Sequence, residues 1–248
     1  NEDQTIPLGV NIDLSIADLD GSQSMEIVLT GIPAGYAPTW NNGLPGTVTN
    51  TAPGEWTITG TTAQALALLD TFALPPITHG DANFSVGIDV TTTEAGGATT
   101  SVSGTQSVTV SAVADAPTVG GTATGNEDTV IAVPINVGLV DTDGTETLDH
   151  VTISGVPATA TFVITPAGGA IATNMGGGVW TITGPTADII STLASGVTIQ
   201  PGLHNGNDIP LTVTAVSTES NPTEGGDVAV PTATTVGIVN VNVIPVAD

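Results

Sequence analysis

The amino-acid sequence predicts an all-β protein made of two tandem β-sandwich domains, and three observations carry this prediction. Hydrophobic residues make up 40% of the chain and aromatic residues only 3%, so valine, isoleucine, alanine and threonine supply most of the strand-forming material. The chain also contains 31 glycines and 17 prolines, which is typical of many short strands joined by turns. The third observation is an internal repeat that spans the whole chain.

The repeat relates the two halves of the chain at an offset of 123 to 125 residues. The matched segments keep the same order, and they are Asn1-Glu2-Asp3 with Asn126-Glu127-Asp128, Asp18-Leu19-Asp20-Gly21 with Asp141-Thr142-Asp143-Gly144, Thr30-Gly31-Ile32-Pro33 with Ser154-Gly155-Val156-Pro157, and Trp56-Thr57-Ile58-Thr59-Gly60 with Trp180-Thr181-Ile182-Thr183-Gly184. After an insertion, Val113-Ala114-Asp115 matches Val246-Ala247-Asp248. We therefore predict domains at residues 1–115 and 116–248 with a linker at about 114–126, and expect the chain to be an excerpt of a longer array.

Alternation of apolar and polar residues predicts half-buried strands in both halves. The clearest runs are 55–59, 85–90, 107–110 and 239–243. About seven such runs in each half, separated by glycine, proline, asparagine and aspartate, are typical of an immunoglobulin-like sandwich. Residues 62–69 and their counterparts 186–193 instead place helix formers at helical spacing with a threonine at the start, so we expect one short helix in each domain.

The sequence contains no lysine or arginine and 24 aspartates and glutamates, which gives a net charge of −24 at pH 7. A chain without basic side chains repels nucleic acids and anionic membrane surfaces, and no apolar run is long enough to cross a bilayer. Cysteine is also absent, which excludes disulfides and thiolate metal sites. Without lysine, arginine, cysteine or a serine-nucleophile motif, the sequence predicts that the protein is not an enzyme.

The acidic residues gather in two corresponding clusters. The clusters are Glu2, Asp3, Asp18, Asp20 and Glu26 in the first half, and Glu127, Asp128, Asp141, Asp143, Glu146 and Asp149 in the second. Buried carboxylates that lack cationic partners need a proton or a metal ion, and oxygen ligands at neutral pH favour calcium. We expect Asp115, in the linker, to converge with Glu127 and the aspartates of the second cluster at one pole of the sandwich. Calcium bound there would stiffen the joint between the domains, whereas a solvated turn is the alternative for a single Asp-x-Asp-Gly.

The frame of Asn-Glu-Asp, Asp-x-Asp-Gly, Gly-(Ile/Val)-Pro, Trp-Thr-Ile-Thr-Gly and Val-Ala-Asp-Ala-Pro resembles the tandem extender repeats of giant RTX adhesins and biofilm-associated surface proteins of Gram-negative bacteria. The resemblance covers essentially the whole chain, although the RTX nonapeptide is absent. It implies immunoglobulin- or cadherin-like domains arranged end to end with calcium at their linkers. It matches the linker acid to Asp115, the Asp-x-Asp pair to Asp141 and Asp143, and the following acid to Glu146. In the first copy, Gln23 stands where Glu146 does.

The function implied by this resemblance is a calcium-stiffened stalk that projects a distal ligand-binding region for cell adhesion and biofilm formation. Such a protein is secreted by a type I system, stays attached to the cell surface and behaves as a monomeric rod. Its partners are adjacent repeats of the same chain and calcium ions, with no nucleic acid and no insertion into a membrane.

The alternative function is a module that binds carbohydrate or protein through its loops. Trp40, which has no counterpart in the sequence repeat, and Tyr36 are the residues that such a module would expose. We expect structural hydrogen bonds at His79 and His204, which occupy matching turns. Glu94 and Glu219 are either extra calcium ligands or residues of solvated loops. We favour solvated loops.

Overall fold

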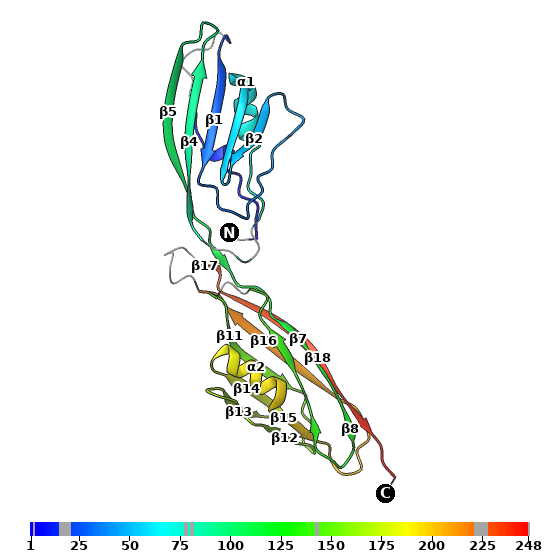
Figure 1. The fold of residues 1–248 in the computed structure, drawn as a ribbon. Coiled ribbons are helices and arrows are strands. Elements are labelled where there is room, and N and C mark those ends of the chain that lie inside the picture. The colour runs from blue at the N-terminus through cyan, green and yellow to red at the C-terminus, as the bar shows by residue number, and fades with distance from the viewer. Residues whose placement is uncertain are drawn as a thin grey trace. The chain divides into compact units, whose positions relative to one another are not determined.

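The computed structural model describes residues 1, 3–14, 21–76, 79, 82–141, 144–220 and 228–247. The protein is all-β, with two tandem sandwich domains and one α-helix in each (Figure 1). Contacts within the chain divide it into two compact units between Ser111 and Ala112. Asp115, which the sequence analysis places last in the first domain, therefore belongs by its contacts to the second unit.

The first unit contains one antiparallel sheet of five strands in the order β2-β3-β1-β4-β5. Its elements are η1 (Gly9–Asn11), β1 (Ser24–Thr30), β2 (Thr47–Ala52), β3 (Glu55–Thr61), α1 (Thr62–Asp70), β4 (Phe84–Thr93) and β5 (Thr99–Val108). The helix α1 packs against β1 and β3. A second layer is held by two single bridges, Ile6 with Leu74 and Thr39 with Ala73. Leucine, isoleucine and phenylalanine side chains from both layers form the core.

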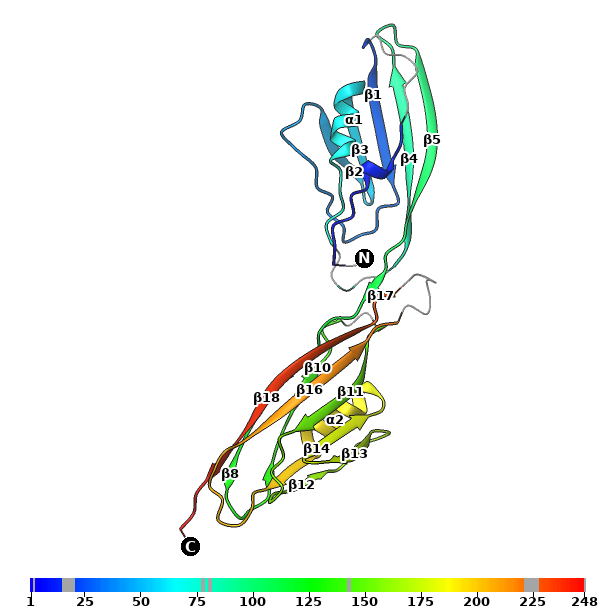
Figure 2. The same ribbon diagram turned by 180° about the vertical axis from the view of Figure 1, so that it is seen from behind.

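The second unit contains a sheet of six strands in the order β13-β14-β11-β16-β18-β8 and a facing sheet in the order β12-β15-β9. Two further strand pairs, β10 with β7 and β17 with β6, complete it. Its elements are β6 (Ala112–Val113), β7 (Thr118–Gly120), β8 (Thr122–Asn126), β9 (Ile131–Ala132), β10 (Asn136–Gly138), β11 (Thr147–Ser154), β12 (Thr161–Ile164), β13 (Ile171–Gly176), β14 (Val179–Thr183), α2 (Thr186–Ser195), β15 (Val197–Gln200), β16 (Ile209–Thr218), β17 (Val228–Val230) and β18 (Thr232–Ile244). Figures 1 and 2 show α2 beside β11 and β14, and β18 running the length of the unit.

The sequence repeat is also a repeat of strand register. Leu29 lies opposite Trp56 in the first unit, and Ile153 lies opposite Trp180 in the second. The β4–β5 hairpin pairs Phe84 with Val108, and the β16–β18 hairpin pairs Ile209 with Val241. The strands β1, β2, β3, β4 and β5 therefore correspond to β11, β13, β14, β16 and β18.

The predicted helices and most predicted strands are confirmed, with differences at their ends. The helix α1 begins after Thr61, whose side chain accepts a hydrogen bond from the amide of Gln64, while the Gln64 side chain bonds back to the amide of Thr61. This capping box satisfies two amides that a helix start leaves free. The helix α2 begins after Pro185, which offers no side-chain cap. The strand predicted at 107–110 is wrong in extent, because β5 runs from Thr99 to Val108.

The two units differ at one edge of the large sheet. In the second unit, β8 pairs in parallel with the end of β18, and β7 packs against the middle of β18. Both strands precede Asn126, the residue that corresponds to Asn1. Within the described residues, the first unit has no counterpart of β7 or β8, so β5 is an edge strand.

Candidate metal centre

A pair of buried glutamates lies at the end of the second unit where β11 begins and β16 ends. The two strands are antiparallel with Thr147 opposite Thr218, so the same register brings Glu146 and Glu219 opposite each other. Glu146 is 5% exposed and Glu219 is 4% exposed. The side chain of Ser220 donates a hydrogen bond of 3.0 Å to the carbonyl of Thr145, which ties the two chain segments together. Like charges at opposing strand positions destabilise a sheet unless something neutralises them.

Two aspartates and a serine surround this pair. The amide of Asp115 donates to Oε1 of Glu146 at 2.8 Å, and the hydroxyl of Ser217 donates to the carbonyl of Asp115 at 2.6 Å. Asp141 is 2% exposed, and its amide also bonds to the Glu146 carboxyl. The structure therefore brings together Asp115, Asp141 and Glu146 of the predicted site, and adds Glu219 to them.

The electrostatics of this carboxylate cluster, formed by Asp115, Asp141, Glu146 and Glu219, favour a cation. Each of the four side chains has a carboxyl oxygen with less than 1 Å² exposed, and Oε2 of Glu146 has no hydrogen-bond partner among the described residues. Burial raises the pKa of Glu146 above its ordinary value of 4.5, and the charge of Asp141 raises it further. The nearby Ser217 hydroxyl and the hydrogen bonds from the amides of Asp115 and Asp141 lower this pKa but do not outweigh the burial.

The donor set fits a calcium ion in chemistry, although the side chains stand apart. All four side chains offer hard oxygen ligands, of the kind calcium takes in sets of roughly six to eight. Within the described residues, the oxygens of no three of these four groups lie within 4.8 Å of one another. A bound cation would draw them together, and no lysine or arginine exists in the chain to do so instead.

The corresponding place in the first unit is built differently. There the amide of Gln23, the counterpart of Glu146, donates from Nε2 to Oε1 of Glu94, the counterpart of Glu219. The hydroxyl of Ser22 donates to Oε2 of Glu94 at 2.8 Å. A neutral side chain thus satisfies the glutamate directly, so this pair carries one negative charge where the second unit carries two. Oε1 of Gln23 is buried without a hydrogen-bond partner in the described part of the chain, and an amide oxygen is itself a calcium ligand.

The structure places Glu127 and Asp128 at the other end of the second unit, so the predicted convergence of these residues with Asp115 and Asp141 is wrong. Glu127 follows β8, whose parallel partner is the last part of β18, whereas the carboxylate cluster adjoins the first part of β18. The 13 residues of β18 separate the two places, which at ~3.3 Å per residue amounts to roughly 40 Å. The reason is the parallel pairing of β8 with β18, which carries the chain to the far end before Glu127.

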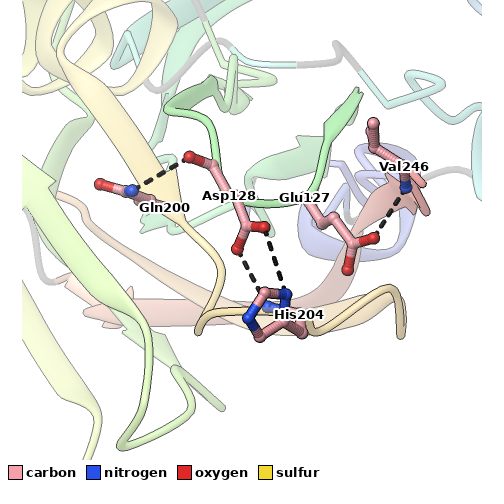
Figure 3. Close-up of polar contacts among 5 residues, drawn as sticks. All are labelled: Glu127, Asp128, Gln200, His204 and Val246. Atoms are coloured by element: carbon pink, nitrogen blue, oxygen red, sulfur yellow. Dashed lines mark hydrogen bonds and ion pairs between the residues drawn. The ribbon is translucent and has the colours of Figure 1, made fainter. Parts of the chain in front are cut away.

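At that far end Glu127 and Asp128 hold other parts of the backbone (Figure 3). Glu127 is 6% exposed, and its Oε1 accepts a hydrogen bond from the amide of Val246 at 2.7 Å. Oδ1 of Asp128 accepts from the amide of His204 at 3.0 Å, and the side chain of Gln200 donates to the carbonyl of Asp128 at 3.2 Å. These bonds give both acids structural roles, and their role as metal ligands stays a prediction.

The same aspartate–histidine contact occurs in the first unit. Oδ1 of Asp3 accepts from the amide of His79 at 3.3 Å, and the two contacts span 76 residues in each copy. Asp3 and Asp128 have φ values of 58° and 60°, and His79 and His204 have φ values of 60° and 54°. Both histidines thus make the structural hydrogen bonds expected of their turns, and they make them through their backbone amides. Four other predicted ligands lie outside the described residues, namely Glu2, Asp18, Asp20 and Asp143.

The tryptophans are half-buried and pack against the cores of the sandwiches. Trp40 stacks on Phe72 with ring centres 6.3 Å apart and packs edge-on against Trp56 at 5.7 Å. Tyr36 packs against Phe84 at 5.5 Å. Trp40 also has a structural counterpart, because Thr39 and Val163 bridge equivalent residues, so that Trp40 corresponds to Ile164. Both aromatic side chains are half-buried and contribute to packing rather than to an exposed ligand platform.

Sequence reasoning missed Glu219 as part of the cluster and favoured a solvated loop for it. The signal that could have found it is the alternation along β16, where Val213, Ala215 and Ser217 all face the interior. Continuing that alternation by one step puts Glu219 on the buried face, where its amide is also bonded to the carbonyl of Pro231.

Comparisons with known proteins give distant structural matches and no family. No protein-family model matches the sequence, and no curated protein matches it. A protocadherin gammaB7 structure described as an EC3-6 cis-dimer matches with a TM-score of 0.30 and 13% identity, over 84% of this chain and 41% of that chain. The protocadherin gamma B2 extracellular cadherin domains 1–5 match with a TM-score of 0.32 and 14% identity, over 86% of this chain and 34% of that one.

A bacterial protein is also among the matches. It is the C-terminal domain of the Streptococcus pyogenes antigen I/II-family protein AspA, with a TM-score of 0.25 and 10% identity, over 86% of this chain and 84% of that one. Similarity at this level does not transfer function, and this chain spans about two fifths of the first protocadherin chain. In the described part of the chain, no helix has the length and apolar character needed to cross a membrane.

Proposed function

We propose that this chain is a calcium-binding structural segment of a bacterial surface adhesin, in which tandem sandwiches act as a spacer. The observation that carries the proposal is the buried carboxylate cluster of the second unit. Above all, Oε2 of Glu146 is buried and has no hydrogen-bond partner among the residues that the structure describes. Asp115, Asp141, Glu146 and Glu219 would hold the ion, together with the predicted ligand Asp143. The ion would supply the positive charge that the chain itself lacks.

Calcium at this cluster would stiffen the chain because of where Asp115 lies in the sequence. Asp115 follows Ala112, the first residue of the second unit, by three positions. An ion bound to Asp115 and to Glu146 would fix the segment that leads into the sandwich. The resemblance to adhesin extender repeats supports the wider proposal of an extracellular stalk, secreted by a type I system and anchored to the surface of a Gram-negative cell. There it would project a distal adhesive region in biofilms.

We propose weaker calcium binding for the acids of the first unit and for those at the far end of the second unit. Glu2, Asp3, Asp18 and Asp20 would bind calcium more weakly, because Gln23 replaces a glutamate and already satisfies Glu94. Glu127 and Asp128 would bind calcium only through carboxyl oxygens that do not already accept a hydrogen bond from a backbone amide. We therefore expect the strongest calcium site to be the carboxylate cluster.

The test is a calorimetric calcium titration of the 248-residue chain after treatment with chelator, paired with thermal unfolding in calcium and in chelator. We expect calcium to stabilise the second unit by about 2.7 kcal/mol at a hundredfold excess over its dissociation constant. Hydrogen exchange should slow in the segments around residues 115, 141, 146 and 219. Small-angle scattering in the same two buffers measures the stiffening.

The control is magnesium at the same concentration, which prefers a smaller and more regular set of ligands and should stabilise less. No heat of binding and identical unfolding curves in calcium and chelator would contradict the calcium site. A rise in unfolding temperature without any change in scattering would keep the site and contradict the stiffening.

A further inference from the structure

Among the described residues, the outer edge of the first unit is a strand without a neighbour on one side, and the strand itself carries no device that discourages pairing. Strand β5 ends its sheet, and its first seven residues are exposed. It contains no charged residue and no proline, and its ladder with β4 has no bulge. Natural proteins usually protect exposed edges with charges, prolines or bulges, because an unprotected edge pairs with other strands.

A groove lies along this edge. It has a volume of about 330 Å³, and the residues that line it include Ile12, Asp13 and Leu14 together with Val102, Gly104 and Gln106 of β5. Val102 is 61% exposed. A second hollow of about 190 Å³ continues along the last part of β5, between Ile6 and residues 106–109. The two hollows together follow β5 on the side where the described part of the chain gives it no partner strand.

The second unit shows what fills this place in the other copy. Strand β7 lies there between β10 and β18, with Val119 opposite Val137, the counterpart of Ile12. Strand β8 then pairs with Asn240–Ile244, the counterparts of residues 107–111. The linings of the two hollows of the first unit therefore include counterparts of residues that β7 and β8 contact in the second, namely Ile12, Gly104 and residues 107–109.

Two glycines at equivalent positions differ in what lies beside them. Gly237 of β18 corresponds to Gly104 of β5, because both stand at the same step of equivalent hairpins. A Cβ at Gly237 would meet Cγ1 of Val119 at 2.7 Å, whereas a Cβ at Gly104 would meet nothing within 4 Å. The described residues of the first unit give no steric reason for glycine at position 104, but a strand packed there as β7 packs on Gly237 would give one.

We propose that the first unit carries an acceptor groove for an extended β-strand with the sequence pattern of residues 118–126. The strand would place its valine over Gly104 and Ile12, as Val119 lies over Gly237 and Val137. It would then run parallel to the end of β5 and bond to its free backbone groups, which is the mode of strand addition. This proposal does not depend on calcium.

The test joins a copy of residues 116–125 directly to the amino group of Asn1, in the place that Gly125 holds before Asn126. The tether keeps the strand at a high effective concentration, so weak affinity cannot hide the effect. Hydrogen exchange followed by mass spectrometry compares this extended chain with the original. We expect exchange in residues 102–109 to slow by about tenfold or more, together with a higher unfolding temperature of the first unit.

Two controls separate strand insertion from a general effect of added sequence. An extension with aspartate at the positions that correspond to Val119 and Ala123 should give no protection. Gly104→Ala should leave the original chain as stable as before, because the space beside it is open, and should cancel the protection in the extended chain.

Three results would overturn the proposal. The first is equal exchange in residues 102–109 with and without the extension. The second is equal protection by the aspartate-bearing extension. The third is an original chain that is already dimeric in solution with β5 protected, because the edge would then be covered by a second copy.

Discussion

At the scale of single residues, the two copies of the repeat differ most tellingly at one position. Gln23 donates a hydrogen bond to Glu94, whereas Glu146 faces Glu219 with both carboxyl groups buried. One amide in place of one carboxylate changes a self-sufficient pair into one that needs a proton or a cation. The dependence of each unit on calcium should therefore follow the identity of this residue.

Replacing Glu146 with glutamine should have opposite effects in chelator and in calcium. In chelator, Glu146→Gln removes a buried negative charge and allows the amide to bond to Glu219, so the second unit should become more stable by about 1 kcal/mol. In calcium the same change removes a ligand, so most of the stabilisation by the ion should be lost. Thermal unfolding of both proteins in both buffers measures the two differences.

The control for this change is Asp149→Asn, which removes an exposed charge three residues away that bonds to His150. It should alter stability little in either buffer. If Glu146→Gln changed stability in the same direction in calcium and in chelator, Glu146 would not be a ligand.

The reciprocal change, Gln23→Glu, should make the first unit resemble the second. It replaces the donor to Glu94 with a second carboxylate, so it should destabilise the first unit in chelator. Calcium should restore part of the loss. Hydrogen exchange resolved by segment distinguishes the two units, and a loss of stability that calcium does not reduce would show that the first unit lacks the other ligands.

At the scale of secondary-structure elements, the two helices begin in different ways. Helix α1 has a complete capping box from Thr61 and Gln64, whereas α2 begins at Pro185 without a side-chain cap and carries Asp188 in its first turn. The side chain of Asp188 accepts a hydrogen bond from the amide of Gly169 at 2.8 Å. The first helix is thus fixed by its own sequence and the second by the neighbouring loop.

Removing the cap of α1 should weaken only the first unit. Thr61→Ala deletes the hydroxyl that accepts from the amide of Gln64, and the loss of such a cap costs about 1 kcal/mol. Chemical denaturation of the chain, with hydrogen exchange to assign the unit, measures the effect. Thr61→Ser keeps the hydroxyl and should behave like the original protein, and an equal loss in both variants would argue against the cap.

At the scale of the whole molecule, the net charge of −24 means that protons and metal ions compete for the same carboxylates. The pH dependence of unfolding, measured with and without calcium, therefore reports on metal binding. Burial raises the pKa of Glu146, so the folded state binds its proton more tightly than the unfolded state does. In chelator, the free energy of unfolding should therefore rise as the pH falls through this raised pKa, and the gain should be complete at about the ordinary value of 4.5. The charge of Asp141 adds to the effect of burial on this carboxyl.

In calcium the sign should reverse, because protons compete with the ion for the same oxygens. Lowering the pH from about 7 to about 5 should raise the unfolding temperature of the second unit in chelator and lower it in saturating calcium. Diffuse repulsion among the 24 acids would also weaken at low pH. The pH dependence that this repulsion causes would remain in Glu146→Gln. A pH dependence that is the same in both buffers would contradict a calcium site in the cluster.

The fold was predictable where one face of a strand is buried and the other is not. Alternation found β3, β4 and β18, but it found only the last two residues of β5, which is exposed on both faces over most of its length. Strands of two or three residues, such as β6 and β10, are too short to show a period. In its described residues, the first unit has five strands and two single bridges rather than seven strands. Part of its second layer pairs only through those bridges, which are too short to show a period.

The candidate site was predictable in composition but not in arrangement. The repeat singled out Asp115, Asp141 and Glu146, which the structure brings together. Glu127 lies adjacent to Asp128 in a motif that also repeats, yet the parallel pairing of β8 with β18 carries both to the other end. Pairing between strands more than 100 residues apart is set by the whole sandwich, and no local pattern reveals it.

The parallel pairing of β8 with β18 also determines how the second unit would bear a mechanical load. Along the chain, β8 is the first strand of the large sheet and β18 is the last, and five residue pairs join them. A pull on the two ends of the unit would slide one strand along the other, so all the hydrogen bonds between them would resist together. An antiparallel hairpin pulled from its open end gives way one bond after another, whereas this geometry makes the β8–β18 ladder a clamp against tension.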